Sequence, residues 1–103
     1  MQKEIAGQNV EVDAEGYLAD LNQWNGEIAK AIASELGITE LSQQHWDVIN
    51  WLRDQKASGN ELNIRKVGGS GVVDIKQFYQ LFPGGPLKNA SKIAGLPKPT
   101  SCL

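Results

Sequence analysis

The residue best suited to chemistry is Cys102, which is the only cysteine of the chain and its penultimate residue. Pro97 and Pro99 come shortly before it. Because a proline fixes its own φ and has no backbone N–H, this stretch cannot continue a helix or join the interior of a sheet. The sequence therefore predicts a flexible, extended and solvated C-terminal arm over residues 95–103, with one thiol near its tip.

Two interpretations of the Cys102 thiol compete. An inert cysteine is usually a small buried hydrophobe, but burial is disfavoured here because a chain terminus beyond two prolines is usually poorly ordered. A terminal cysteine also occurs in expression scars and in lipidation sites. Prenylation needs a cysteine three residues before the last residue, whereas only Leu103 follows Cys102. From position alone, a reactive thiol and an inert one both stay open.

His45 and the glycine-rich run at residues 68–71 are the other candidates for chemistry. His45 is the only histidine, and zinc usually takes three or four protein ligands, so a structural hydrogen bond is favoured over a metal site. The glycine-rich run lacks the G-K-[ST] ending and the preceding strand of a phosphate loop, which favours a turn between helices. We expect neither a metal nor a cofactor.

The tryptophans are assigned to the packed core, and the lysines near the C-terminus are assigned to the surface. The three tryptophans are predicted in the core, because two of them share one helix with apolar residues; they are Trp24, Trp46 and Trp51. Three lysines make the C-terminal end locally basic, namely Lys88, Lys92 and Lys98. These lysines either steer an acidic partner or RNA or simply solvate the surface, and for any single lysine we favour solvation.

The elements that must position these residues follow from apolar spacing. Residues 3–12 predict a β-hairpin with a turn at Gly7, which must pack on helices because two strands alone are marginally stable. Helical spacing predicts helices at about 25–36, at about 39–57 from Thr39 or Ser42, through residues 62–67, through 73–82 and at 87–94. Pro86 suits the first turn of the last helix and Gly95 suits its stop.

Length and composition limit the organisation and the partners. A chain of 103 residues with 41% hydrophobic and 21% charged residues fits one globular domain, residues 1–94, followed by the arm. No apolar run is long enough to cross a membrane, and the N-terminus lacks the apolar segment of a secretion signal. One cysteine permits no internal disulfide. A reducing cytoplasm is the expected setting.

Three short helices in tandem after Ser58 raise the possibility of a helix-turn-helix. The net charge of −2 gives no basic field for nucleic acid. We therefore expect no direct DNA binding, although a regulatory or nucleic-acid-binding module remains an alternative function.

Several motifs are distributed over nearly the whole chain. They are Glu15-Gly16-Tyr17-Leu18, Trp24, His45-Trp46, Leu52-Arg53, Arg65, Tyr79-Gln80-Leu81-Phe82-Pro83, Gly85-Pro86, and Lys92-Ile93-Ala94-Gly95-Leu96-Pro97-Lys98-Pro99 followed by the penultimate Cys102. Together these motifs resemble the DsrC/TusE family of small sulfur-relay proteins. The last of these motifs is highly specific.

The resemblance implies a mainly α fold with a small N-terminal β-hairpin (α+β). It is an orthogonal helical bundle with a helix-turn-helix-like part and a mobile C-terminal arm. It also implies that Cys102 carries sulfur as a persulfide or trisulfide. The implied partners are an upstream sulfur-donor complex of the TusBCD or DsrEFH type and a downstream tRNA thiolase or sulfite reductase. The chain would then be a sulfurtransferase-type carrier, with its partners supplying most of the catalysis.

Three departures from the family pattern bear on which pathway the chain serves. DsrC-type members have a second cysteine where this chain has Ser91, and serine cannot form their disulfide or bridging trisulfide. Leu62 replaces a proline three residues before Arg65, and the segment 68–76 is shorter than in many bacterial members. Single-cysteine members resemble TusE, which implies a relay toward 2-thiouridine in tRNA. A DsrC-like subunit or partner of dissimilatory sulfite reductase is the alternative.

Cys102 reactivity depends on its thiolate fraction and its access. A free cysteine has a pKa of about 8.5, so nearby positive charge would raise that fraction. Lys98 is four residues away, and Arg65 is a candidate if the arm folds back. The C-terminal carboxylate at Leu103 opposes them.

Overall fold

The chain begins with a two-stranded antiparallel hairpin. In the computed structural model, which describes residues 1–97, β1 (Gln2–Ile5) pairs with β2 (Gln8–Glu11), and Ile5 lies opposite Gln8. The turn residues Ala6 and Gly7 have φ values of 54° and 77°, as a two-residue turn between twisted strands requires. This confirms the predicted hairpin. Lys98 to Leu103, including Cys102, lie outside the described residues.

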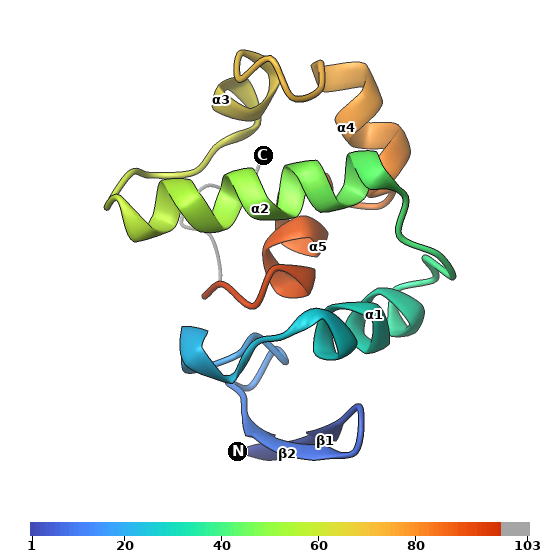
Figure 1. Ribbon diagram of the computed structural model, residues 1–103, viewed down its shortest axis with the longest axis vertical. Coiled ribbons are helices and arrows are strands. Elements are labelled where there is room, and N and C mark those ends of the chain that lie inside the picture. Colours follow the sequence, from blue (N-terminus) through green and yellow to red (C-terminus); the bar gives the residue numbers. More distant parts are fainter. Residues whose placement is uncertain (98–103) are drawn as a thin grey trace.

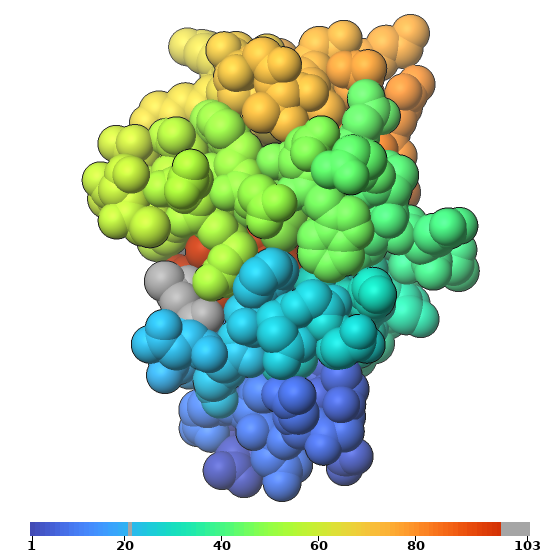
Figure 2. Space-filling view, viewed as in Figure 1, coloured from blue at the N-terminus to red at the C-terminus, as the bar shows by residue number. Residues whose placement is uncertain are grey.

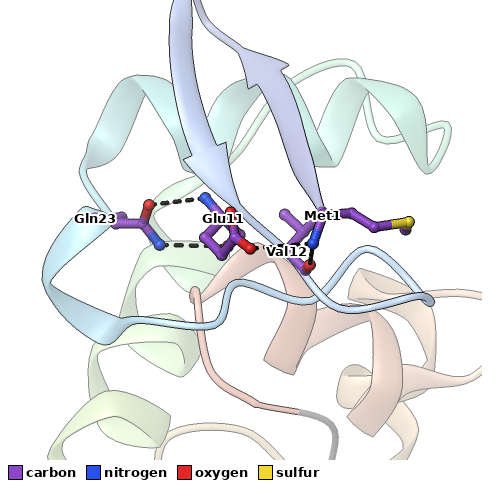
Figure 3. Close-up of polar contacts among 4 residues, drawn as sticks. All are labelled: Met1, Glu11, Val12 and Gln23. Atoms are coloured by element: carbon purple, nitrogen blue, oxygen red, sulfur yellow. Dashed lines mark hydrogen bonds and ion pairs between the residues drawn. The ribbon is translucent and has the colours of Figure 1, made fainter.

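Side-chain contacts tie the base of the hairpin to the segment that follows it (Figure 3). Gln23, at the end of the short 3-10 helix η1 (Leu21–Gln23), accepts from the Glu11 backbone N–H at 2.8 Å and donates to the Glu11 carbonyl at 3.3 Å. The Met1 amino group donates to the Val12 carbonyl at 3.1 Å. These contacts fix the chain just before Trp24.

Five helices follow, and four of them start at a side-chain cap. They are α1 (Gly26–Glu35), α2 (Gln43–Ala57), α3 (Ile64–Gly68), α4 (Ile75–Leu81) and α5 (Pro86–Ile93). Asn25, Ser42, Asn63 and Asp74 each accept a hydrogen bond from a backbone N–H of the following first turn, which is the usual role of these residue types. The predicted start at Asn25 is confirmed, and of the two predicted starts of the second helix, Thr39 and Ser42, the structure has Ser42.

Helix α5 lies between α1 and α2 and contacts both (Figure 1). Its buried residues include Leu87, Ala90 and Ile93, which meet the apolar faces of the two neighbours. Helices α3 and α4 pack on each other at one end of the molecule, and the hairpin occupies the opposite end (Figure 2). A mainly helical fold with a small N-terminal hairpin is therefore confirmed.

The three tryptophans do not lie inside the core as predicted. Trp24, Trp46 and Trp51 are half-buried and pack against the outside of the core cluster. The reason is size: the core is filled by aliphatic residues and by Phe78 and Phe82, while a large amphipathic indole often keeps an edge at the surface.

No helix among residues 1–97 is both long enough and apolar enough to span a membrane.

Candidate functional site at the base of the C-terminal arm

Helix α5 ends in a hydrogen-bonded stop that sets where the chain leaves the domain. The Gly95 N–H donates to the Lys92 carbonyl at 3.2 Å, and the Leu96 N–H donates to the Ser91 carbonyl at 3.0 Å. Gly95 has a φ of 71°. This pair of bonds around a left-handed glycine is the Schellman stop, and it confirms Gly95 as the predicted end of the helix.

Leu96 corrects the predicted start of the arm. The sequence predicts a solvated arm over residues 95–103, but only 1% of Leu96 is exposed and its side chain belongs to the core cluster. A hydrophobic contact at this position commonly accompanies the Schellman stop. The packed part of the chain therefore extends through Leu96, and Pro97 is the first exposed residue after it.

Trp24 holds the end of α5 from one side. Its indole Nε1–H donates to the Ile93 carbonyl at 2.7 Å. The same ring abuts Gly95, where a Cβ would collide with the indole. Gly95 is thus required for two reasons, its positive φ and the close approach of Trp24.

Arg53, from α2, holds the same helix end. Its Nη1 donates to the Ala94 carbonyl at 2.7 Å, and its guanidinium carbon lies 4.2 Å from the centroid of the Trp24 ring. Burial lowers the pKa of Arg53, but an arginine stays charged at neutral pH. A cation at a helix C-terminus also opposes the partial negative charge there. We call Trp24, Arg53, Ala94, Gly95 and Leu96 the arm base.

Ser91, the position of the missing second cysteine, lies inside the domain. It is fully buried, and among the described residues its Oγ has no hydrogen-bond partner. A buried hydroxyl without a hydrogen-bond partner lowers the free energy of unfolding. Hydrogen bonding within the domain therefore does not account for a serine at this position.

The basic residues considered for Cys102 lie in different places. Lys92, in the last turn of α5, has its Nζ 5.1 Å from the centroid of the Tyr17 ring, and Lys88 is exposed on the same helix. Arg65 is exposed on α3, across α2 from α5 (Figure 1). The described structure therefore brings Arg53, rather than Arg65, to the arm base. Lys98 lies outside the described residues.

His45 has the structural role predicted for it. Its Nδ1 accepts from the Ser42 backbone N–H at 3.0 Å, and its Nε2 contacts the Leu81 carbonyl at 2.9 Å. Since an N–H can only donate and a carbonyl can only accept, the proton is on Nε2. The ring also packs edge-on against Phe82. His45 thus joins the start of α2 to the end of α4.

Sequence reasoning missed the roles of Trp24 and Arg53 at the arm base. Arg53 lies four residues after the buried Ile49 on α2, and this spacing places its stem beside the apolar face. The spacing could have indicated that the Arg53 stem is partly buried. It could not have indicated the hydrogen bond to the Ala94 carbonyl, 41 residues later, because that contact depends on the tertiary fold.

The contacts of the arm base hold the chain in place through Leu96. They are the hydrogen-bonded stop, the two side-chain donors and the buried Leu96. Among residues 1–97, no group of three or more His, Cys, Asp or Glu side chains is placed to hold a metal ion.

The sequence profile of the family described as "DsrC like protein" matches residues 4–103. This chain belongs to the DsrC-like family. Curated relatives from Shigella dysenteriae serotype 1 and Escherichia coli K12, both called "Sulfurtransferase TusE", are 40% identical to it over 111 aligned positions, covering 94% of this chain and 95% of the relative.

Solved structures agree with this family assignment. The crystal structure of dissimilatory sulfite reductase I (DsrI) has a TM-score of 0.86 at 38% identity, with both chains fully covered. The oxidised γ-subunit of the dissimilatory sulfite reductase (DsrC) from Archaeoglobus fulgidus has a TM-score of 0.82 at 33% identity, again with both chains fully covered. The DsrC-like fold is therefore the fold of the part of the chain that the structure describes, residues 1–97.

Proposed function

We propose that this DsrC-like protein is a sulfur carrier that accepts and passes on a sulfane sulfur at Cys102. The observation that carries the proposal is the penultimate cysteine in a chain that matches sulfurtransferases called TusE over 94% of its length. The arm base supports the proposal because it gives the seven residues after Leu96 a fixed starting point. A fixed starting point lowers the conformational entropy that the C-terminal segment loses when Cys102 enters the cleft of a partner protein.

The transfer step is a thiol exchange without net oxidation. The Cys102 thiolate attacks the outer sulfur of a donor persulfide R–S–SH. The donor S–S bond breaks, a new S–S bond forms at Cys102, and R–S⁻ leaves as a thiolate that can take up a proton. The products are Cys102–S–SH and the donor thiol. Discharge to an acceptor proceeds by the same kind of exchange.

Intact-mass spectrometry after incubation with glutathione persulfide tests the proposal. We expect one added sulfur atom on the wild-type chain, located at Cys102 by peptide mapping and removed by dithiothreitol. The variant Cys102→Ser should gain none, because it has no thiol. Equal labelling of Cys102→Ser, or no labelling of the wild type, would contradict the proposal.

Among sulfur-relay pathways, we propose thiolation of tRNA, with a TusBCD-type donor complex upstream and a tRNA thiolase downstream. Ser91 supports this choice, since it removes the second cysteine that the resemblance assigns to DsrC-type chemistry. The test mixes the chain persulfidated at Cys102 with a tRNA thiolase from a TusBCD-type pathway and its tRNA. The measurement is the amount of 2-thiouridine formed.

A second candidate is a subunit or partner of dissimilatory sulfite reductase. It is favoured by the two similar solved structures, which are described as sulfite reductase proteins. Co-purification with a sulfite reductase, together with no 2-thiouridine formation, would support this candidate over the tRNA pathway.

A further inference from the structure

The exposed apolar side chains of the domain gather on α4. Among residues 1–97, apart from Met1, the large hydrophobic residues recorded as exposed are Ile75 and Tyr79, at 45% and 49%. They are four residues apart on one helix, so they lie on the same face. Their neighbours Phe78 and Phe82 are buried in the core, whereas the side chains of Ile75 and Tyr79 are exposed to solvent.

Helix α3 extends this apolar surface. A Cβ on Gly68 would collide with the Ile75 side chain, so Ile75 lies directly against the α3 backbone. Ile64, one turn before Gly68, is half-exposed. The two helices form the end of the molecule farthest from the hairpin (Figures 1 and 2). We call Ile64, Arg65, Ile75, Lys76 and Tyr79 the α3–α4 patch.

Basic residues outnumber acidic ones around this patch, although the exposed Glu61 lies just before α3 and its carbonyl accepts from Lys66 Nζ at 2.9 Å. Residues 62–82 contain three basic residues, Arg65, Lys66 and Lys76, and one acidic residue, Asp74. All three basic residues are exposed, and none of them is in an ion pair recorded among residues 1–97. The Asp74 carboxylate accepts a hydrogen bond from the Gln77 N–H at 2.7 Å as the cap of α4. A locally basic rim on a chain of net charge −2 favours an acidic partner.

We propose that the α3–α4 patch is the binding site for the donor protein that transfers sulfur to Cys102. The matching surface of that donor would be an apolar depression with an acidic rim. The inference deepens the proposed function and rests on it. Tyrosine and arginine are the residue types that most often carry binding energy in protein interfaces. Nucleic acid is the less suitable occupant, because phosphate binding uses many basic contacts and the centre of this patch is apolar.

Docking at α3–α4 is compatible with chemistry at the arm. Cys102 is six residues beyond the buried Leu96, so the backbone can carry it at most about 20 Å from that point. The longest dimension of the molecule is 35 Å, a length that one partner protein can span while it contacts both the patch and the thiol. Docking then raises the effective concentration of the donor at the thiol.

The test compares a protein donor with a small-molecule donor. The first donor is the persulfidated TusBCD-type complex from the same organism, and the second is glutathione persulfide. For Tyr79→Ala and for the double variant Arg65→Glu/Lys76→Glu, we expect the KM for loading by the complex to rise at least about tenfold. Loading by glutathione persulfide should be unchanged, because it needs no docking. The matched control is Lys30→Glu, an exposed lysine on α1, which should load normally with both donors.

The outcomes separate this inference from the proposed function. Unchanged KM values for the complex in both patch variants would overturn docking at α3–α4 while leaving the carrier function intact. No loading of the wild type by either donor would overturn the carrier function and the inference with it. Loss of tRNA or duplex DNA binding in the patch variants, with normal loading by the complex, would assign the patch to nucleic acid and overturn the inference. Circular dichroism spectra matching the wild type establish that each variant is folded.

Discussion

Single side chains determine where the C-terminal segment starts. Trp24 and Arg53 come from distant parts of the sequence and bind two consecutive carbonyls, those of Ile93 and Ala94. Their stacking at 4.2 Å means that a change in one displaces the other. These two residues therefore hold the end of α5 and the point at which the chain continues beyond Leu96.

Removing the indole N–H of Trp24 should destabilise the end of α5. In Trp24→Phe the ring remains but the Ile93 carbonyl loses its 2.7 Å hydrogen bond, and we expect a loss of about 1–2 kcal/mol in the free energy of unfolding. Urea denaturation measures it. Trp51→Phe is the control, since Trp51 is also half-buried against the core, and it should lose less. Equal losses in both variants would show that only ring volume matters.

The buried hydroxyl of Ser91 should be a net cost to stability. In Ser91→Ala the unpartnered Oγ is removed from a fully buried site, and we expect a gain of about 1 kcal/mol. The melting temperature should rise by a few degrees for a domain of this size, about 4–8 °C. Calorimetry checks this, and a lower melting temperature would mean that the hydroxyl makes a contact that stabilises the domain.

At the scale of elements, helix ends are the best-determined features. The sequence predicts a helix start at Asn25, another at Thr39 or Ser42 and a helix stop at Gly95, and Asn25, Ser42 and Gly95 have these roles in the structure. Local chemistry suffices for these, because a cap bonds to its own first turn. The sequence did not indicate that Leu96 turns inward after the stop, since that depends on the core that receives it.

A methyl group at Gly95 should damage the end of α5 more than the same change elsewhere. Gly95→Ala combines a φ of 71° with a collision against Trp24, and we expect a loss of about 2–4 kcal/mol. Gly37→Ala is the matched control: it has a φ of 88° but no atom within 4 Å of the added Cβ. It should lose only the backbone cost, about 1–2 kcal/mol. Equal losses by urea denaturation would exclude a contribution from Trp24.

At the scale of the whole molecule, the family and the fold class could be predicted from the sequence, but the surfaces could not. The hairpin, the five helices and the DsrC-like resemblance all follow from local patterns and motifs. The arm base joins the segment between η1 and α1 to α2 and to the end of α5, and the α3–α4 patch depends on how two short helices pack. Both arise from contacts between elements, which periodicity along one chain does not specify.

Oxidation should join two copies of the chain and leave each domain unchanged. Cys102 is the only cysteine, so a disulfide can form only between molecules. We expect a dimer on non-reducing gels after treatment with diamide, a thiol oxidant, and none for Cys102→Ser. The melting temperature of the dimer should match that of the monomer, because the arm base remains intact. A large change in melting temperature would mean that the thiol contributes to domain packing.

The histidine between α2 and α4 has a practical consequence. Its imidazole proton is enclosed against the Leu81 carbonyl, so it should exchange slowly with water and give a separate resonance in proton NMR spectra. Because Leu81 is the last residue of α4, that resonance is a natural reporter on the patch helix. It should shift when a protein occupies that helix and stay in place when sulfur is added at the chain's end, so that recognition and chemistry can be observed separately in one sample.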